Sequence, residues 1–142
     1  KSDYYFINKS DIYWGIKNKA DIETKWKVAF PATGIKQYKY NWLLKPGELV
    51  TDKFLVIMFD DKDEAMNCQK YISTKFASFA IRTLIVDQNA LRKVYRNVPL
   101  LNFKKEKDLD WSESVSEIDN QLYNKFALEE EDIKFIDNFI KR

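Results

Sequence analysis

The fold of this chain is decided by KFLVIMF at residues 53–59, DDKDEAMNCQKYISTKFASFAIRTLIV at residues 60–86 and VPLLNF at residues 98–103. The first is a near-continuous apolar run, typical of a β-strand that is covered on both faces. The second has apolar residues at three- and four-residue spacing, which predicts one long helix with one side against a core. The third predicts another short strand. The residues expected on the inner side of the helix are Ala65, Cys68, Ile72, Phe76, Phe79 and Thr83.

The two ends of this predicted helix carry different signals. Asp60 and Asp61 offer an N-cap, and Glu64 follows Asp61 at capping-box spacing. On the outer side, Lys75, Ser78 and Arg82 recur at i, i+3 and i+7. This polar line with two cations is suited to contact with an anionic partner.

Short strands are predicted on the amino-terminal side, at residues 4–7, 12–16, 25–30 and 36–44, where apolar and polar residues alternate. The strand at residues 25–30 is expected to bury one face and present a basic face on the other. Lys45-Pro46-Gly47-Glu48 has the proline and glycine placement of a type II turn.

Two helices are predicted on the carboxy-terminal side. Val115, Ile118, Leu122 and Phe126 lie on one face of the first. The second is expected to turn inward Ile133, Ile136 and either Phe139 or Ile140. The predicted fold is therefore α+β, with a mixed or antiparallel sheet of short strands, one long packed helix and a C-terminal helical pair.

The composition is that of one folded domain over residues 1–142, since 45% of the residues are hydrophobic and 32% are charged. Residues 1–107 hold 20 Lys and Arg against 12 Asp and Glu, a net charge of +8. Residues 108–142 hold 4 against 10, a net charge of −6. This division predicts a basic recognition core that can contact nucleic acid, followed by an acidic helical appendage that faces elsewhere.

Membrane insertion and secretion are not expected. No run of about 18 apolar residues occurs, and the start of the chain has no signal-peptide pattern. Cys68 is the single cysteine, and its place on the apolar side of a helix predicts a small buried thiol. A cytoplasmic location fits these features.

Several catalytic chemistries require residues that this sequence lacks. It contains no histidine, which excludes Ser-His-Asp and Cys-His catalysis as well as histidine metal sites. Its three glycines are too far apart for a phosphate-binding loop. One enzymatic alternative stays open, a metal-dependent nuclease in which Glu23 and Lys25 lie on one face of a strand with Asp11 or Asp21 as a further acid.

An ordered series of short motifs resembles the carboxy-terminal part of bacterial adenine-specific DNA methyltransferases, specifically combined restriction-modification methylases. The series covers residues 53–140 at least. It consists of Ser73-Thr74-Lys75-Phe76, Arg92-Lys93-Val94-Tyr95, Val98-Pro99-Leu100, Trp111, Leu122-Tyr123, Phe126, the run at residues 128–133 and Phe135-Ile136. At position 129, where that family often has a helix-capping Ser or Thr, this chain has Glu129.

The resemblance implies a role in DNA recognition without catalysis. The Asn-Pro-Pro-Tyr motif and the glycine-containing S-adenosylmethionine loop of that family are absent, so the chain is expected to be a piece of a larger enzyme that holds this cofactor elsewhere. Its expected partners are double-stranded DNA and the catalytic methyltransferase domain. The side chains expected to contact DNA are Lys27, Lys36, Lys39, Tyr40, Lys75, Arg82, Arg92, Lys93 and Arg96.

A competing interpretation comes from a different class of protein. In it, the chain is a protein-interaction or structural domain whose acidic helices bind a partner, and its basic half is merely a solvated surface.

Overall fold

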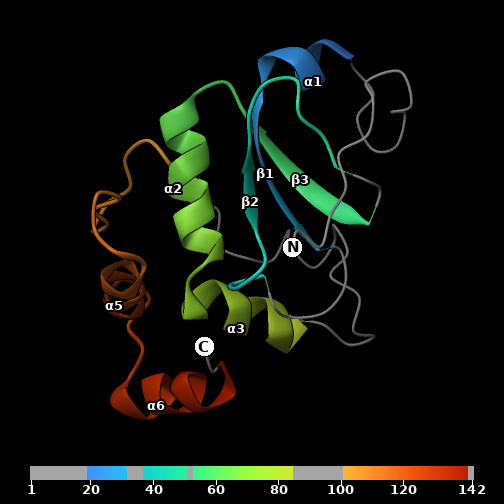
Figure 1. The fold of residues 1–142 in the computed structure, drawn as a ribbon. Helices are drawn as coiled ribbons and strands as arrows, with labels where there is room; N and C mark the ends of the chain where they lie inside the picture. The colour runs from blue at the N-terminus through green and yellow to red at the C-terminus, as the bar shows by residue number, and fades with distance from the viewer. Residues whose placement is uncertain (1–18, 32–36, 51–52, 85–100, 141–142) are drawn as a thin grey trace.

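The computed structural model describes residues 19–31, 37–50, 53–84 and 101–140, and Figure 1 traces their course. These residues form an α+β fold, in agreement with the sequence prediction. Its strands are β1 (Trp26–Pro31), β2 (Trp42–Leu44) and β3 (Phe54–Phe59). Its helices are α1 (Lys19–Thr24), α2 (Lys62–Ile72), α3 (Lys75–Leu84), α5 (Val115–Lys125) and α6 (Glu130–Phe139).

The described strands form one antiparallel sheet in the order β2-β1-β3. Lys27 of β1 pairs with Leu44 of β2, and Trp26 pairs with Phe59 of β3. Of the two predicted sheet types, the antiparallel one is therefore present in the described residues. The predicted strands at residues 4–7 and 12–16 lie outside them.

Both faces of the central strand β1 are buried. Val28 and Phe30 belong to the main core on the helix side, while Ala29 packs with Leu44 and Val50 on the other side. The predicted basic face of β1 is therefore wrong, because a second apolar cluster covers it.

The other strand predictions are met only in part. Strand β3, expected to be covered on both faces, is partly covered on both: Ile57 and Phe59 pack against the main core, and Phe54 and Val56 pack against the second cluster. Met58, near its end, is 39% exposed. The strand predicted at residues 36–44 is reduced to β2, because residues 37–40 form a turn and a bend. Of the strand predicted at residues 98–103, the described part, residues 101–103, is a loop.

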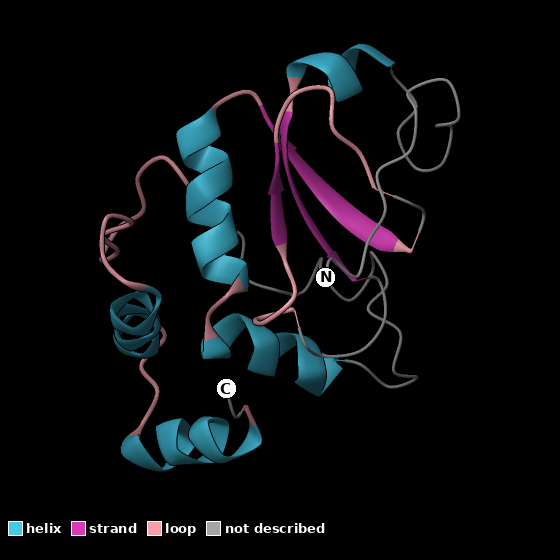
Figure 2. Ribbon diagram, viewed as in Figure 1, coloured by secondary structure: helices cyan, strands magenta, loops and turns pink. Residues whose placement is uncertain are grey.

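Helix α2 lies against all three strands (Figure 2). Its start follows the prediction. Asp61 is the N-cap, and its carboxylate accepts a hydrogen bond of 3.1 Å from the Glu64 N–H. The predicted inner side is confirmed for Ala65, Cys68 and Ile72, which are buried. Burial raises the pKa of the Cys68 thiol, as expected for an inert core cysteine.

The single long helix is in fact two helices, because Ser73 and Thr74 separate α2 from α3. The Thr74 hydroxyl accepts from the Ala77 N–H at 3.1 Å and so caps the first turn of α3. The carboxylate of Asp119, on α5, accepts from the N–H groups of Lys75 and Phe76, both at 2.9 Å. A new helix begins here because local and long-range acceptors satisfy N–H groups that a continuous helix would bond internally.

The predicted C-terminal helical pair is confirmed. Helix α5 contacts both α2 and α3, while α6 contacts α3 (Figure 1). Ser114 caps α5 by accepting from the Glu117 N–H at 3.2 Å. Ile136 and Ile140 of the α6 segment are buried in the main core, as predicted.

The connection at residues 101–114 is tied to α2 and α5 by specific hydrogen bonds. Lys70 donates through Nζ to the carbonyl of Trp111 at 2.6 Å, and Asn67 donates to the carbonyl of Phe103 at 2.7 Å. The indole of Trp111 is buried and donates to the Asn102 carbonyl at 3.0 Å.

Within the described ranges, no helix is long and apolar enough to cross a membrane.

Candidate functional site

Lys27 lies inside the protein. It is fully buried, and its Nζ donates to the carbonyl oxygens of Ile22 at 3.0 Å, Lys25 at 2.6 Å and Lys45 at 3.4 Å. Burial lowers the pKa of this ammonium group, while the nearby Glu48 carboxylate acts in the opposite direction. The prediction that Lys27 contacts DNA is wrong, because this cation fastens the end of α1 to the turn at residues 45–48.

That turn is the predicted type II turn. The Glu48 N–H donates to the Lys45 carbonyl at 3.0 Å, and Gly47 has a φ of 91°. A positive φ at this position is what glycine permits without a steric penalty. The Gly47 N–H also donates to the Ile22 carbonyl at 2.7 Å, so the turn and Lys27 share one acceptor.

Lys39 and Tyr40 lie at the surface of the turn that precedes β2. Lys39 is exposed, and its Nζ lies 5.4 Å from the centre of the Tyr40 ring. Asn41 donates through Nδ2 to the Ser73 hydroxyl at 3.0 Å, and this contact holds the turn against the α2–α3 junction. Two predicted DNA contacts therefore lie beside the start of the helix that carries a third, Lys75.

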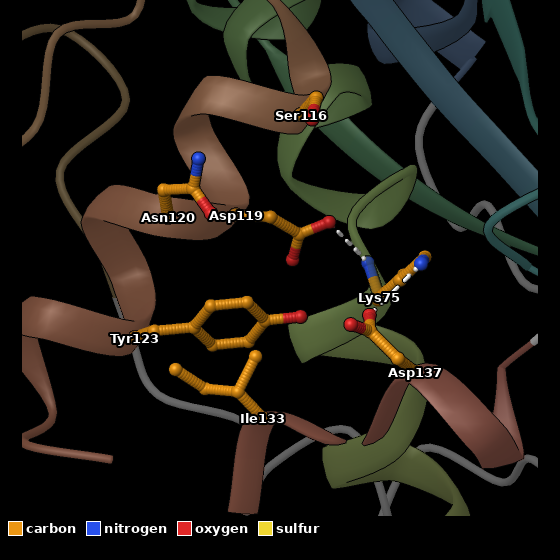
Figure 3. Close-up of a pocket in the computed structure, with 7 residues that line it drawn as sticks. All are labelled: Lys75, Ser116, Asp119, Asn120, Tyr123, Ile133 and Asp137. Atoms are coloured by element: carbon orange, nitrogen blue, oxygen red, sulfur yellow. Dashed lines mark hydrogen bonds and ion pairs between the residues drawn. The ribbon is translucent and has the colours of Figure 1, made fainter. Parts of the chain in front are cut away.

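Lys75 is engaged at both its backbone and its side chain (Figure 3). Its N–H donates to Asp119, and its Nζ forms an ion pair of 2.9 Å with Asp137 of α6. Ser78, one turn further along α3, is buried. The polar line predicted along α3 is therefore not an open face in the described residues, since α6 supplies the anion that pairs with its first cation.

A cavity of about 310 Å³ lies where the first turn of α3 meets α5 and α6 (Figure 3). Its lining carries one cation and two carboxylates among neutral groups. The lining residues are Lys75, Ser116, Asp119, Asn120, Tyr123, Ile133 and Asp137. The N–H groups at the start of α3, which would otherwise suit a phosphate, are already bonded to the Asp119 carboxylate. The cavity is therefore not built as an anion site.

The side chains of the other five predicted contacts lie outside the described part of the structure. Lys36, Arg92, Lys93 and Arg96 lie outside the described residues, as does the side chain of Arg82. Their convergence with Lys39 and Tyr40 stays a prediction.

The nuclease alternative is not supported by the geometry of its residues. Glu23 belongs to α1, whereas Lys25 lies after that helix and forms an ion pair with Asp60, which raises the Lys25 pKa. The two side chains therefore do not occupy alternate positions of one strand, as the motif requires. Within the described part of the chain, no group of three Asp, Glu or Cys side chains is placed to hold a metal ion.

The carboxylates that organise this region were not among the predicted site residues. Asp119 follows Ile118 on the inward side of α5 and is itself buried. The sequence did contain a signal for this, an aspartate next to the apolar positions of a predicted helix. A carboxylate that is buried in the core requires hydrogen-bond donors, so such an aspartate indicates a structural contact. The sequence could not show that those donors belong to α3.

Comparison of the chain with protein-family models, with curated proteins and with solved structures found no match.

Proposed function

We propose that this chain is the DNA-binding target-recognition region of a bacterial adenine-specific DNA methyltransferase of the restriction-modification type. The motif series of residues 53–140 supports the family. The observation that carries the DNA contact is the Lys39–Tyr40 pair, an exposed cation over an aromatic ring on a turn anchored to the α2–α3 junction.

Lys39 and Tyr40 have the chemical properties that a DNA-recognition region requires. An enzyme that modifies a base extrudes it from the duplex, so a second surface must hold the DNA while neighbouring base edges are read. A lysine supplies a phosphate contact, and a tyrosine can stack on a base or bond to the backbone. Arg92, Lys93 and Arg96 supply the further cations of this proposal, together with Lys36 and Arg82.

The cofactor and the chemistry belong to the rest of the enzyme in this proposal. S-adenosylmethionine binds to the catalytic domain, which is also the protein partner of this chain. The enzyme acts on double-stranded DNA in the cytoplasm. No residue of this chain is assigned a catalytic role.

Binding to short DNA duplexes over a series of salt concentrations tests the proposal. Each phosphate contact adds about one unit to the slope of log affinity against log salt, because binding releases condensed counterions. We expect Lys39→Gln to reduce that slope by about 1 and to weaken binding severalfold. Lys134→Gln is the matched control, because it removes the same charge from the acidic helix α6.

Two results would refute the proposed role. One is binding that does not weaken as salt rises, and the other is an equal loss in Lys39→Gln and Lys134→Gln. Weak binding with a steep salt slope still supports the proposal, since a recognition region separated from its enzyme holds only part of the interface.

A further inference from the structure

Two large aromatic side chains at the carboxy-terminal end are exposed although each rests on a ring of α3. Phe126 is 37% exposed and stacks on Phe76, with ring centres 5.1 Å apart and planes 14° from parallel. Phe135 is 51% exposed and meets Phe79 edge to face at 5.8 Å. Phe76 is buried and Phe79 packs against the main core, so both outer rings have a firm support.

Two carboxylates lie on the side of Phe135 that is toward the start of α6. Glu131 and Asp132 precede Phe135 by four and three residues, so they share its face of α6. Both are exposed, and the Asp132 carboxylate also accepts from the Glu129 N–H at 3.0 Å. Phe126 and Phe135 rest on rings that are three residues apart on α3 and so share one of its faces. Phe126, Phe135, Glu131 and Asp132 are together called the acidic aromatic face.

This combination selects one chemical class of partner. A guanidinium or ammonium group is attracted to the face of an aromatic ring and to a carboxylate at the same time. An exposed phenylalanine gains stability when an apolar side chain covers it. Nucleic acid is disfavoured here, because its phosphates would meet the carboxylates of α6.

We propose that the acidic aromatic face binds a basic, amphipathic segment of another protein. In this complex an arginine of the segment lies over Phe135 and an apolar residue lies against Phe126. The charge of the face identifies the partner as cationic. The inference does not depend on DNA binding, since the Lys39–Tyr40 turn contributes nothing to this face.

The test uses a short synthetic peptide that carries arginine and leucine on one helical face. We expect it to shift the amide resonances of α6 in the intact chain and to bind more weakly as salt rises. Phe135→Ala and Glu131→Gln should each weaken binding by about threefold to tenfold, the effect of losing one ring or charge contact. Met66→Ala is the control, because Met66 is a 39% exposed apolar residue of α2 outside this face. The Met66→Ala variant should bind the peptide with the same affinity as the unaltered chain.

Other outcomes would overturn the proposal. A peptide with glutamate in place of arginine that binds equally well would remove the role of charge. Unchanged affinity in Phe135→Ala would remove the role of the ring. Self-association of the chain that Phe135→Ala abolishes, measured by sedimentation equilibrium, would make a second copy the occupant. Displacement of the peptide by duplex DNA would place phosphates on this face.

Discussion

Lys27 shows how a cation can serve a structural purpose inside a protein. Its ammonium group donates to three backbone carbonyls, including one at the end of α1. We expect Lys27→Met to lower the free energy of unfolding by about 2–4 kcal/mol, because it removes the ammonium donor from backbone carbonyls in a buried corner of the protein. Lys53→Met, at an exposed position, should change it by less than about 0.5 kcal/mol. Urea unfolding of both variants checks this, and equal stability would contradict the assigned role.

Asp119 is the corresponding buried anion. Its two bonds to the first N–H groups of α3 combine an N-cap with a favourable interaction between charge and helix dipole. We expect Asp119→Ala to lower the free energy of unfolding by about 2–3 kcal/mol. Asp119→Asn should lower it less, because the amide oxygen can still accept one bond. Glu117→Gln, exposed on the same helix, is the control. Amide exchange of Lys75 and Phe76 should accelerate in Asp119→Ala, and unchanged protection of both would exclude the capping role.

These two residues mark what sequence can reveal at this scale. The cap at Asp61 and the positive φ at Gly47 were predictable, because each depends on neighbours within three residues. The partners of Lys27 and Asp119 lie on other elements, up to 44 residues away for Asp119 and Lys75. A lysine on a strand and an aspartate on a helix usually face solvent, so only the assembled structure shows them buried.

The end of helix α5 carries an unfavourable residue at a defined position. Ala127 has a φ of 54°, and the bonds Ala127 N–H to Asn124 O and Leu128 N–H to Tyr123 O form a Schellman motif. Glycine at this position avoids the cost of the left-handed conformation. Ala127→Gly should therefore raise the free energy of unfolding by about 0.5–1 kcal/mol, the balance between relief of that cost and the greater freedom of the unfolded chain.

The matched variant for this position is Ala127→Val. A β-branched residue is strongly disfavoured at positive φ, so thermal unfolding should give the order Gly, Ala, Val from most to least stable. A glycine variant less stable than the parent chain would show that the motif does not form in solution.

The loop at residues 101–114, which precedes α5, should make stability depend on pH. The pKa of Glu106 is lowered, first because its carboxylate accepts from the Asn102 N–H at 2.7 Å, and also because Lys125 lies 3.5 Å away. A carboxyl with a lowered folded pKa stabilises the fold fully above its usual value of 4.5. That contribution is lost as the pH falls through the folded pKa.

Glu106→Gln tests this linkage. The variant should be about 0.5–1 kcal/mol less stable than the parent chain near neutral pH, an amount limited by solvent screening. The difference should shrink below pH 4.5 and vanish once the carboxyl of the parent chain is protonated. Urea unfolding at several pH values measures it, with Glu113→Gln of the same loop as the control. A difference that stays constant with pH would assign the loss to packing.

At the scale of elements, the strands of the sheet, helix α2 and the C-terminal helical pair followed from periodicity, while the break between α2 and α3 and the start of β2 did not. Residues 60–84 keep one apolar period through Ser73 and Thr74, and this is why one helix was predicted where two exist. The turn at residues 37–40 interrupts an alternating pattern in a similar way. In both places hydrogen bonds to distant residues, Asp119 for one and Ser73 for the other, determine where the element begins.

Across the whole molecule, the division of charge along the sequence becomes a contact between elements. Helix α6, from the acidic part, packs on α3, from the basic part, and Asp137 pairs with Lys75. The sequence indicated that the two parts differ in charge. It did not indicate that an aspartate of the acidic part would form an ion pair with a lysine of the basic part that was predicted to contact DNA.

The pairing yields a prediction that rests on the proposed function. If DNA phosphate and Asp137 compete for Lys75, then Asp137→Asn should raise affinity for duplex DNA by about twofold to fivefold, since the exposed pair is worth no more than about 1 kcal/mol. Glu131→Gln is the control, because it removes the same charge from α6 at a position without contact to Lys75. Its smaller effect on DNA affinity measures how much the general repulsion between α6 and the DNA phosphates contributes.

A second substitution distinguishes competition for Lys75 from a general effect of the net charge of α6. Placing Lys75→Gln in the Asp137→Asn background should cancel the gain, because coupled residues give non-additive effects. Equal gains in Asp137→Asn and Glu131→Gln would show that α6 acts on DNA only through net charge. A gain that persists without Lys75 would show that the cation belongs to the packing of α3 against α6, and DNA recognition would then depend on Lys39 and the other cations alone.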